Sequence, residues 1–449
     1  MSVGEMMVYE LILLRPGSLK ILVINISGKF CLPRLHVPHW TRPAEQLQKA
    51  IRATLGLHVI VLDFLVFEES GTVGVIAELL FPNTNPILRE VALEDVPAAT
   101  AGDDLEASIL SGSESPLSQP GWIDEAVAWL ESVTQRKLSS KSGIEQLNAG
   151  GAFSLVRFRM EDGSHYWLKA TGEPNCHELS VTCLLSELCG DYLPQLIASR
   201  PAWNAWLMSG ETAQVIEPPA DPAQLLQWLE DAVESMAEVQ MRTAGRHQEL
   251  LKAGTFDQRI DVFLQRSEAV FDYLEEAMHV QISMKAPRLS KPCLRECRAI
   301  FEDVCRRTED LGLPVTIVHG DLNPGNILSG SGHAKFIDGC EAYVGNPLIA
   351  LQHLLRLNNI ENRGLRMEIN QALRRRYRDT WANAFDSVRF QRGFPYMPVL
   401  AIFSSLLGRG DWLTSPKRND PRFQSYSRTL ARHLDRALRE PELMEVSCD

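Results

Sequence analysis

The hydrophobic pattern of the first 92 residues is that of short strands around one helix. Strands are predicted where apolar residues alternate or run together, at 8–14, 19–26, 29–32, 59–67 and 73–81. Pro16-Gly17 and Ser27-Gly28 supply turn formers between the first three. Apolar residues at helical spacing predict a helix over 43–57. Residues 1–92 are therefore expected to form a small α+β domain.

A change of composition separates this domain from the next. Residues 93–120 are dominated by Glu, Asp, Ala, Ser, Gly and Pro, which predicts a flexible linker because so few apolar side chains cannot offset the entropy of ordering. After an apolar helix stripe that begins at Trp122, two strands are predicted at 155–160 and 166–170, followed by a helix at about 176–189. We expect residues 121–212 to form a β-rich lobe.

From residue 213 to residue 449 the pattern becomes mostly helical. Two apolar stripes at helical spacing illustrate it, one of Leu226, Leu229, Val233, Met236 and Ala237, the other of Ile260, Phe263, Leu264, Phe271 and Leu274. The predicted fold class is α+β, with the N-terminal domain and the β-rich lobe followed by a mostly helical lobe.

Composition narrows the classes of partner. The 449 residues carry 45 Lys and Arg against 57 Asp and Glu, a formal charge of −12, which argues against nucleic acid or an anionic membrane as the partner. The nine cysteines include no CxxC pair and fit thiols in a reducing compartment. The sequence shows no signal-peptide pattern and no apolar run of membrane-spanning length, so we expect a cytoplasmic protein.

Candidate chemistry lies in residues 315–328, VTIVHGDLNPGNIL, followed by AKFID at 334–338. In each segment a short apolar strand ends in polar residues. Phosphoryl transfer needs metal ligands and a group that accepts a hydroxyl proton. Asp321 suits the role of base, Asn326 and Asp338 offer the oxygen ligands that Mg²⁺ prefers, and His319 is placed to brace the loop by hydrogen bonding.

The pattern HGDLxPGNIL followed by FID resembles the aminoglycoside-phosphotransferase family, which includes choline, homoserine and macrolide kinases, over residues of about 121–439. The resemblance implies a two-lobed protein-kinase-like fold. It also implies transfer of the γ-phosphate of ATP or GTP, with Mg²⁺, to a hydroxyl group of a small molecule. A pseudokinase, which would bind nucleotide as a sensor or scaffold, is the alternative, and a Nudix hydrolase with an accessory domain is a second one.

The resemblance assigns further residues to nucleotide binding. Lys169 would grip phosphate and Glu178 would orient that lysine, although a solvated strand lysine and a helix-surface glutamate are the alternatives. The phosphate-covering loop would comprise residues 148–154, which include Gly150, Gly151 and Ser154; a simple turn would also explain its glycines. Met208 would belong to the hinge at 206–209 that contacts the base, and an apolar strand end is the alternative.

Some positions depart from the family pattern. Gly339 follows the second aspartate where tryptophan is common, and Asn346 and Ala350 replace aspartates farther on. These changes weaken the inference about the substrate more than the inference about the chemistry. From residue 213 to residue 288 there are 13 acidic and 7 basic residues, an excess that suits a cationic acceptor such as an amine-bearing sugar, or that lies on solvated helix faces.

Residues 6–82 resemble a Nudix domain, with a strand hairpin, FCLPRLHVP, and a helix ending in LGL. Several residues depart from a working Nudix box. The residues at the positions of its glycine and its Arg-Glu and Glu-Glu pairs are Leu35, Lys49, Ala50, Ala53 and Thr54. The resemblance then implies a degenerate domain without hydrolytic activity that serves binding, dimerisation or regulation. The alternative is a small α+β module of other ancestry.

Overall fold

The computed structural model describes residues 6–18, 20–38, 42–66, 73–93, 116–210, 214–215, 217–330, 333–382 and 384–440. The chain divides into two compact units, residues 1–179 with 194–211, and residues 180–193 with 212–449. The predicted N-terminal domain and the predicted β-rich lobe thus belong to one unit. Most of the predicted linker, residues 94–115, lies outside the described residues.

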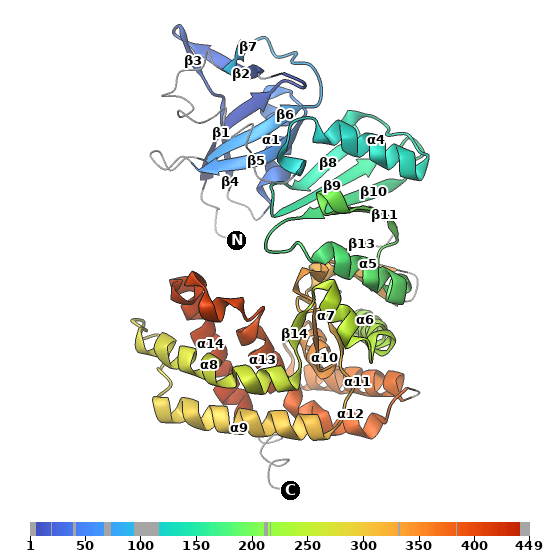
Figure 1. The fold of residues 1–449 in the computed structure, drawn as a ribbon, viewed down its shortest axis with the longest axis vertical. Coiled ribbons are helices and arrows are strands. Elements are labelled where there is room, and N and C mark those ends of the chain that lie inside the picture. Colours follow the sequence, from blue (N-terminus) through green and yellow to red (C-terminus); the bar gives the residue numbers. More distant parts are fainter. Residues whose placement is uncertain are drawn as a thin grey trace. The chain divides into compact units, whose positions relative to one another are not determined.

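The first unit contains two sheets (Figure 1). Its elements are β1 (Met6–Leu14), β2 (Lys20–Ile26), β3 (Lys29–Cys31), β4 (Arg34–Pro38), α1 (Pro43–Leu55), β5 (Val59–Val66), β6 (Val73–Leu79), β7 (Leu88–Ala92), α4 (Trp122–Thr134), β8 (Ile144–Asn148), β9 (Phe153–Arg159), β10 (His165–Thr171), β11 (Leu196–Arg200) and β12 (Ala205–Ser209). The seven-stranded sheet has the order β3-β2-β1-β6-β5, with β4 added beside β1 and β7 beside β2, and the five-stranded sheet has the order β11-β12-β10-β9-β8.

Alternation along β1 explains how the two sheets share a core. Leu11 and Leu13 point to the face covered by the α1 residues Leu47 and Ile51. Ile12 and Leu14 point to the opposite face, where they pack with α4 and with apolar residues of the five-stranded sheet. The apolar face of the N-terminal part is therefore buried against the part that follows it.

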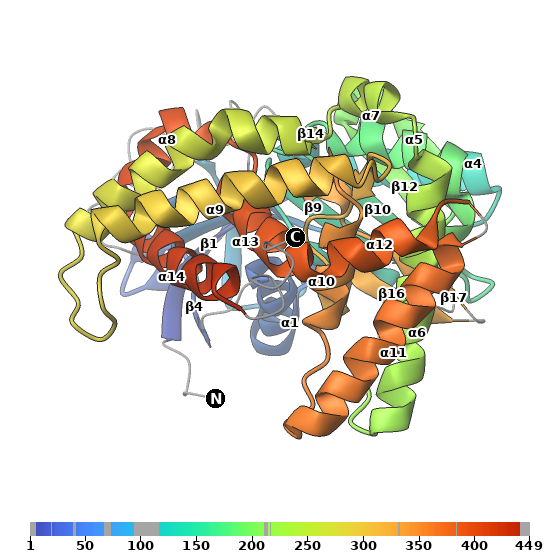
Figure 2. The ribbon, with the colours of Figure 1, turned by 90° about the horizontal axis from the view of Figure 1, so that it is seen from below.

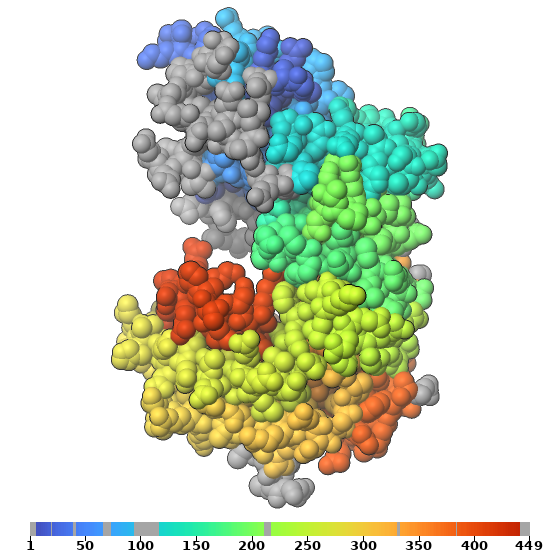
Figure 3. Space-filling view, in the orientation of Figure 1, coloured from blue at the N-terminus to red at the C-terminus, as the bar shows by residue number. Residues whose placement is uncertain are grey.

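The second unit is mostly helical, as predicted. Its elements are α5 (Glu178–Cys189), whose first two residues belong to the first unit, β13 (Gln214–Val215), α6 (Pro222–Thr243), α7 (His247–Ala253), β14 (Phe256–Gln258), α8 (Ile260–His279), α9 (Lys291–Asp310), β15 (Thr316–Val318), β16 (Ile327–Gly330), β17 (His333–Phe336), β18 (Tyr343–Gly345), α10 (Leu348–Leu355), α11 (Arg363–Trp381), α12 (Ser387–Gly393), α13 (Met397–Leu407) and α14 (Pro421–Leu438). Helices α6 and α11 pack side by side (Figure 2), and α8 and α9 lie together on one face (Figures 1 and 3).

The predicted α+β class, with β-rich and helical parts, is confirmed. Strands β4 and β7 were not expected, because β4 is short and β7 follows a segment rich in turn formers. None of the helices in the described ranges combines the length and the apolar composition that crossing a lipid bilayer requires.

Candidate active site

Lys169 lies in β10, where it is in register with Leu155 of β9 and Trp206 of β12. Its Nζ is 2.5 Å from Oε1 of Glu178, the first residue of α5. The two side chains are only 7% and 2% exposed, so both the solvated lysine and the helix-surface glutamate are excluded. The Lys169 ammonium also lies 4.9 Å from the centre of the Phe153 ring. The first unit therefore holds a buried ammonium fixed by a carboxylate.

The glycine-containing loop between β8 and β9 is held against the end of β10. A Cβ on Gly172, which follows β10, would lie 2.1 Å from the carbonyl oxygen of Gly151, so only glycine fits there. The N–H of Gly172 donates to the carbonyl of Ala152 at 3.0 Å. Ser154 is buried, and its hydroxyl donates to the carbonyl of Gly150 at 3.0 Å. Our sequence reasoning missed Gly172; an isolated glycine directly after a strand was the available signal.

Met208 is part of β12, an interior strand of the five-stranded sheet. It is in register with Trp167 of β10 on one side and with Leu196 of β11 on the other. The residue is half-buried. Met208 is thus a strand residue near the end of β12, and its role at the base stays a prediction.

In the second unit, the residues after β15 form a compact polar loop. Asn326 Nδ2 donates to the main-chain oxygen of Asp321 at 2.9 Å and to Asp321 Oδ2 at 3.1 Å. Asn323 Nδ2 also donates to Asp321 Oδ2 at 3.1 Å, while Asn323 Oδ1 accepts from the N–H of Gly325 at 2.9 Å. Two side-chain amides therefore orient the Asp321 carboxylate through the same oxygen. The sequence alone had not pointed to Asn323.

His319 connects this loop to the strand that follows. Its Nε2 is 2.8 Å from the carbonyl oxygen of Ile337, and the N–H of Ile337 donates to the carbonyl of Asn326 at 3.1 Å. The hydrogen bond expected of His319 is therefore present. Gly320 has a φ of +82°, and a Cβ on it would lie 2.0 Å from the carbonyl oxygen of Glu341. The HGD step consequently requires glycine for both conformation and space.

Asp338 follows β17 and lies in the left-handed region, with φ 66° and ψ 63°. A non-glycine residue in this region is strained, and such strain is concentrated at functional sites. The hairpin of β16 and β17, with Ile327 in register with Phe336, carries Asn326 at its start and Asp338 just past its end. The loop and the second aspartate are therefore connected through one short hairpin.

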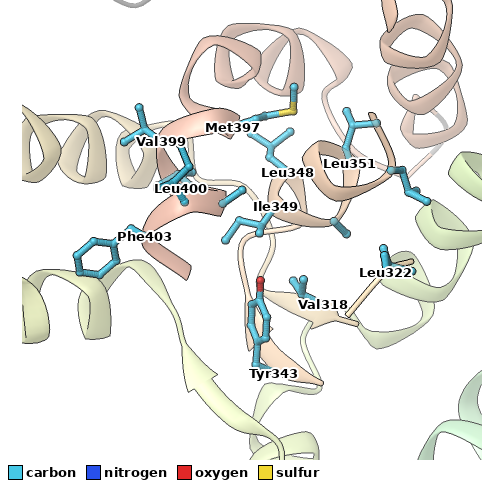
Figure 4. Close-up of a cluster of buried hydrophobic side chains, with 14 of the residues drawn as sticks. Val318, Leu322, Tyr343, Leu348, Ile349, Leu351, Met397, Val399, Leu400 and Phe403 are labelled. Atoms are coloured by element: carbon cyan, nitrogen blue, oxygen red, sulfur yellow. The ribbon is translucent and has the colours of Figure 1, made fainter. Parts of the chain in front are cut away.

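Tightly packed apolar residues support the loop. Figure 4 shows Val318 and Leu322 facing a cluster that includes Tyr343 and Ile349, all of them buried. His353 of α10 is also buried here, and burial, followed by electrostatic interaction with Arg356 and His319, lowers its pKa to about 4. Its imidazole is neutral at pH 7, so the core beneath the loop gains no charge.

The side-chain oxygen atoms of this loop and of Asp338 suit Mg²⁺ as ligands. Asn326 uses its amide nitrogen on Asp321, and within the described part of the chain its Oδ1 accepts no hydrogen bond. Carboxylate and amide oxygens are the hard ligands that this ion prefers. A different cluster, Cys293, Cys297 and Asp435, also has metal-ligating atoms close together. There Asp435 Oδ1 already accepts hydrogen bonds from both thiols and from the guanidinium of Arg439, which opposes a cation.

The model of a phosphotransferase enzyme family, the family of the aminoglycoside phosphotransferases, matches residues 159–390, more than half of the chain. This match agrees with the fold and with the polar loop at 319–326, and it makes the protein a phosphotransferase. The chain belongs to the phosphotransferase enzyme family.

Solved structures resemble the chain more weakly. Plasmodium vivax ethanolamine kinase is 12% identical, with 68% of this chain and 84% of that one covered and a TM-score of 0.46. Macrolide 2′-phosphotransferase MphH from Brachybacterium faecium is 16% identical, with 72% and 99% covered and a TM-score of 0.43. A GDP complex of aminoglycoside 2′-phosphotransferase-IIIa is 15% identical, with 70% and 99% covered and a TM-score of 0.45. No curated protein matches the sequence.

Proposed function

We propose that this protein is a small-molecule kinase that transfers the γ-phosphate of ATP or GTP to a hydroxyl group of its acceptor. The observation that carries the proposal is the geometry at Asp321, whose Oδ2 accepts hydrogen bonds from Asn323 and Asn326. Within the described residues, Oδ1 of Asp321 accepts none, and the residue is exposed. One oxygen is therefore held in place while the other is open to a substrate.

In the proposed reaction, Asp321 Oδ1 accepts the proton of the acceptor hydroxyl. The hydroxyl oxygen forms a bond to the γ-phosphorus, the bond from that phosphorus to the bridging oxygen breaks, and the nucleoside diphosphate leaves. Asn326 and Asp338 would hold Mg²⁺, which neutralises charge on the phosphate oxygens when it is bound. Lys169, fixed by Glu178, would hold the nucleotide phosphates. His319 keeps the loop in its conformation.

The acceptor's charge stays a prediction. Many acidic side chains of residues 213–288 are already in ion pairs, among them Glu234 with Arg376 and Glu276 with Arg418. Such pairs favour the interpretation in which the acidic excess lies on solvated helix faces. Both cationic and neutral hydroxyl compounds therefore belong in an acceptor screen.

The test is an acceptor screen with the full chain, Mg²⁺ and ATP or GTP, in which acceptor-dependent release of nucleoside diphosphate is measured. Amino sugars, amino alcohols and macrolides represent the acceptor classes. Asp321→Asn keeps the side-chain shape but removes the base, and the rate should fall by about 10²–10⁴-fold. Asp310→Asn, at the exposed end of α9, is the matched control and should keep the wild-type rate.

Two results would contradict the proposal. Asp321→Asn could retain the full rate, which would exclude Asp321 as the base. Alternatively, nucleotide could bind while phosphate is transferred to no acceptor in any class, which would favour the pseudokinase.

A further inference from the structure

The strand that leads into the glycine-containing loop is attached to the N-terminal sheet by a buried glutamine. Gln146 of β8 is 1% exposed. Its Nε2 donates to the carbonyl of Val61 at 2.8 Å, and its Oε1 accepts from the N–H of Val61 at 2.7 Å. Val61 lies in β5, at the end of the path β3-β2-β1-β6-β5 and beside a bulge in its pairing with β6. The side-chain amide thus takes the place of a neighbouring strand at a sheet edge.

A second glutamine completes the attachment from α1. Gln48 Oε1 accepts from the main-chain N–H of Gln146 at 3.1 Å, and Gln48 Nε2 donates to the carbonyl of Val59 at 2.9 Å. The same nitrogen is 3.5 Å from the carbonyl oxygen of Ile144. The side-chain amides of Gln146 in β8 and Gln48 in α1 therefore hold β8 to β5. Because most of these groups are buried, a polar group that loses its hydrogen bond cannot replace it with one to water.

This attachment lies two residues before the loop. β8 ends at Asn148, and its pairing with β9 is shifted between Gln146 and Asn148. Ala149, the next residue, packs against the core beneath α1. A Cβ on Gly150 would lie 3.8 Å from Asp63 Oδ1 of β5. The N-terminal part thus contacts the first half of the loop, while Gly172 contacts its second half.

We infer that the N-terminal α+β part is a positioning element for the nucleotide-binding loop and that Gln146 is the residue that couples them. The inference rests on the proposed function, in which residues 148–154 cover the nucleotide phosphates. A loop fixed before the ligand arrives loses less conformational freedom on binding, and affinity rises accordingly. The N-terminal part therefore contributes to nucleotide affinity without touching the nucleotide.

The test compares Gln146→Leu with the wild-type full chain in two measurements. The first is amide hydrogen exchange of peptides covering residues 148–154 without nucleotide, which should become faster in the variant. The second is steady-state kinetics, in which KM for nucleotide should rise about five- to tenfold while kcat stays within about twofold, as expected when an ordering cost is added to binding. Gln146→Glu sets a carboxylate oxygen against the Val61 carbonyl in a buried site, so at pH 7 it should raise loop exchange and KM at least as much as Gln146→Leu.

Ile12→Ala is the matched control, because it opens the shared core of the first unit without removing a hydrogen bond to the loop. It should lower Tm about as much as Gln146→Leu but leave loop exchange and KM unchanged. The inference is overturned if Gln146→Leu leaves both readouts at wild-type values, or if Ile12→Ala raises KM equally. Failure of the wild type to bind nucleotide would instead refute the proposed function, and the exchange measurement would still decide whether Gln146 fixes the loop.

Discussion

Breaking the Lys169–Glu178 ion pair should destabilise the first unit strongly. The two charged atoms are 2.5 Å apart, and the side chains are 7% and 2% exposed. Removal of one partner takes its opposite charge away from a buried group, which typically costs about 3–5 kcal/mol. We therefore expect Lys169→Met to lower the free energy of unfolding by about 3–5 kcal/mol. Glu178→Gln should cost about 3 kcal/mol, since its amide oxygen can still accept from the ammonium.

The double variant Lys169→Met/Glu178→Gln tests the physical reason. Because both charges of the pair are removed, it should be more stable than the sum of the two single losses predicts, by about 2 kcal/mol. Lys49→Met is the control, since the Lys49–Glu45 pair on α1 has side chains 74% and 31% exposed. Its loss should cost at most about 0.5 kcal/mol.

Urea unfolding followed by tryptophan fluorescence would measure these free energies, with the transition of each unit fitted separately if two are seen. The reasoning is refuted if Lys169→Met costs less than about 1 kcal/mol, which would place the pair among solvent-exposed ones. Strict additivity in the double variant would also contradict it, because a buried pair must show coupling.

Three further predictions concern buried groups. His353 has a pKa of about 4 in the folded protein against 6.5 in the unfolded chain. The stability that its neutral form contributes is therefore present above pH 6.5 and lost as the pH falls to 4. Over that range the free energy of unfolding of the wild type should fall by about 3 kcal/mol more than that of His353→Leu. Burial raises the pKa of Glu78, so Glu78→Gln should be more stable than wild type at pH 7, and thermal melts should show the advantage fading towards pH 4.5; an equal difference at both pH values would contradict this. Gly320→Ala must displace the carbonyl of Glu341 and should cost more than about 2 kcal/mol and most of the activity, whereas Gly339→Ala, with nothing within 4 Å and no positive φ, should change little in the same assays.

Much of the polar loop of residues 319–326 could be predicted from the sequence because its interactions are local. Asp321, Asn323 and Asn326 lie within a span of six residues, and their hydrogen bonds follow from a short turn through Pro324. The Lys169–Glu178 pair was also within reach, because a strand and the helix after it bring together residues nine apart. Here the family pattern assigned the residues, and the structure shows that they are buried together.

The remaining features depend on contacts between distant segments, which single-sequence patterns do not report. Gln146 meets Val61 across 85 residues, and nothing in the alternation of β8 distinguishes it from an exposed glutamine. The shared core likewise forms because β1 has two apolar faces, and the sequence does not say what covers the second one. The Nudix-like ancestry of the N-terminal part and the roles of Met208 at the base and Asp338 at the metal stay predictions.

The most direct test of the central claim is nucleotide-dependent thermal stabilisation of the full chain, with and without Mg²⁺, in wild type and Asp338→Asn. Asparagine tolerates the left-handed backbone of residue 338, so this change removes the charge without adding strain. Ligand at about 100 times its Kd should stabilise the wild type by about 2.7 kcal/mol. We predict a Mg²⁺-dependent rise in Tm that Asp338→Asn loses and Asp310→Asn keeps. No rise with either ATP or GTP would contradict the assignment of a nucleotide-dependent kinase.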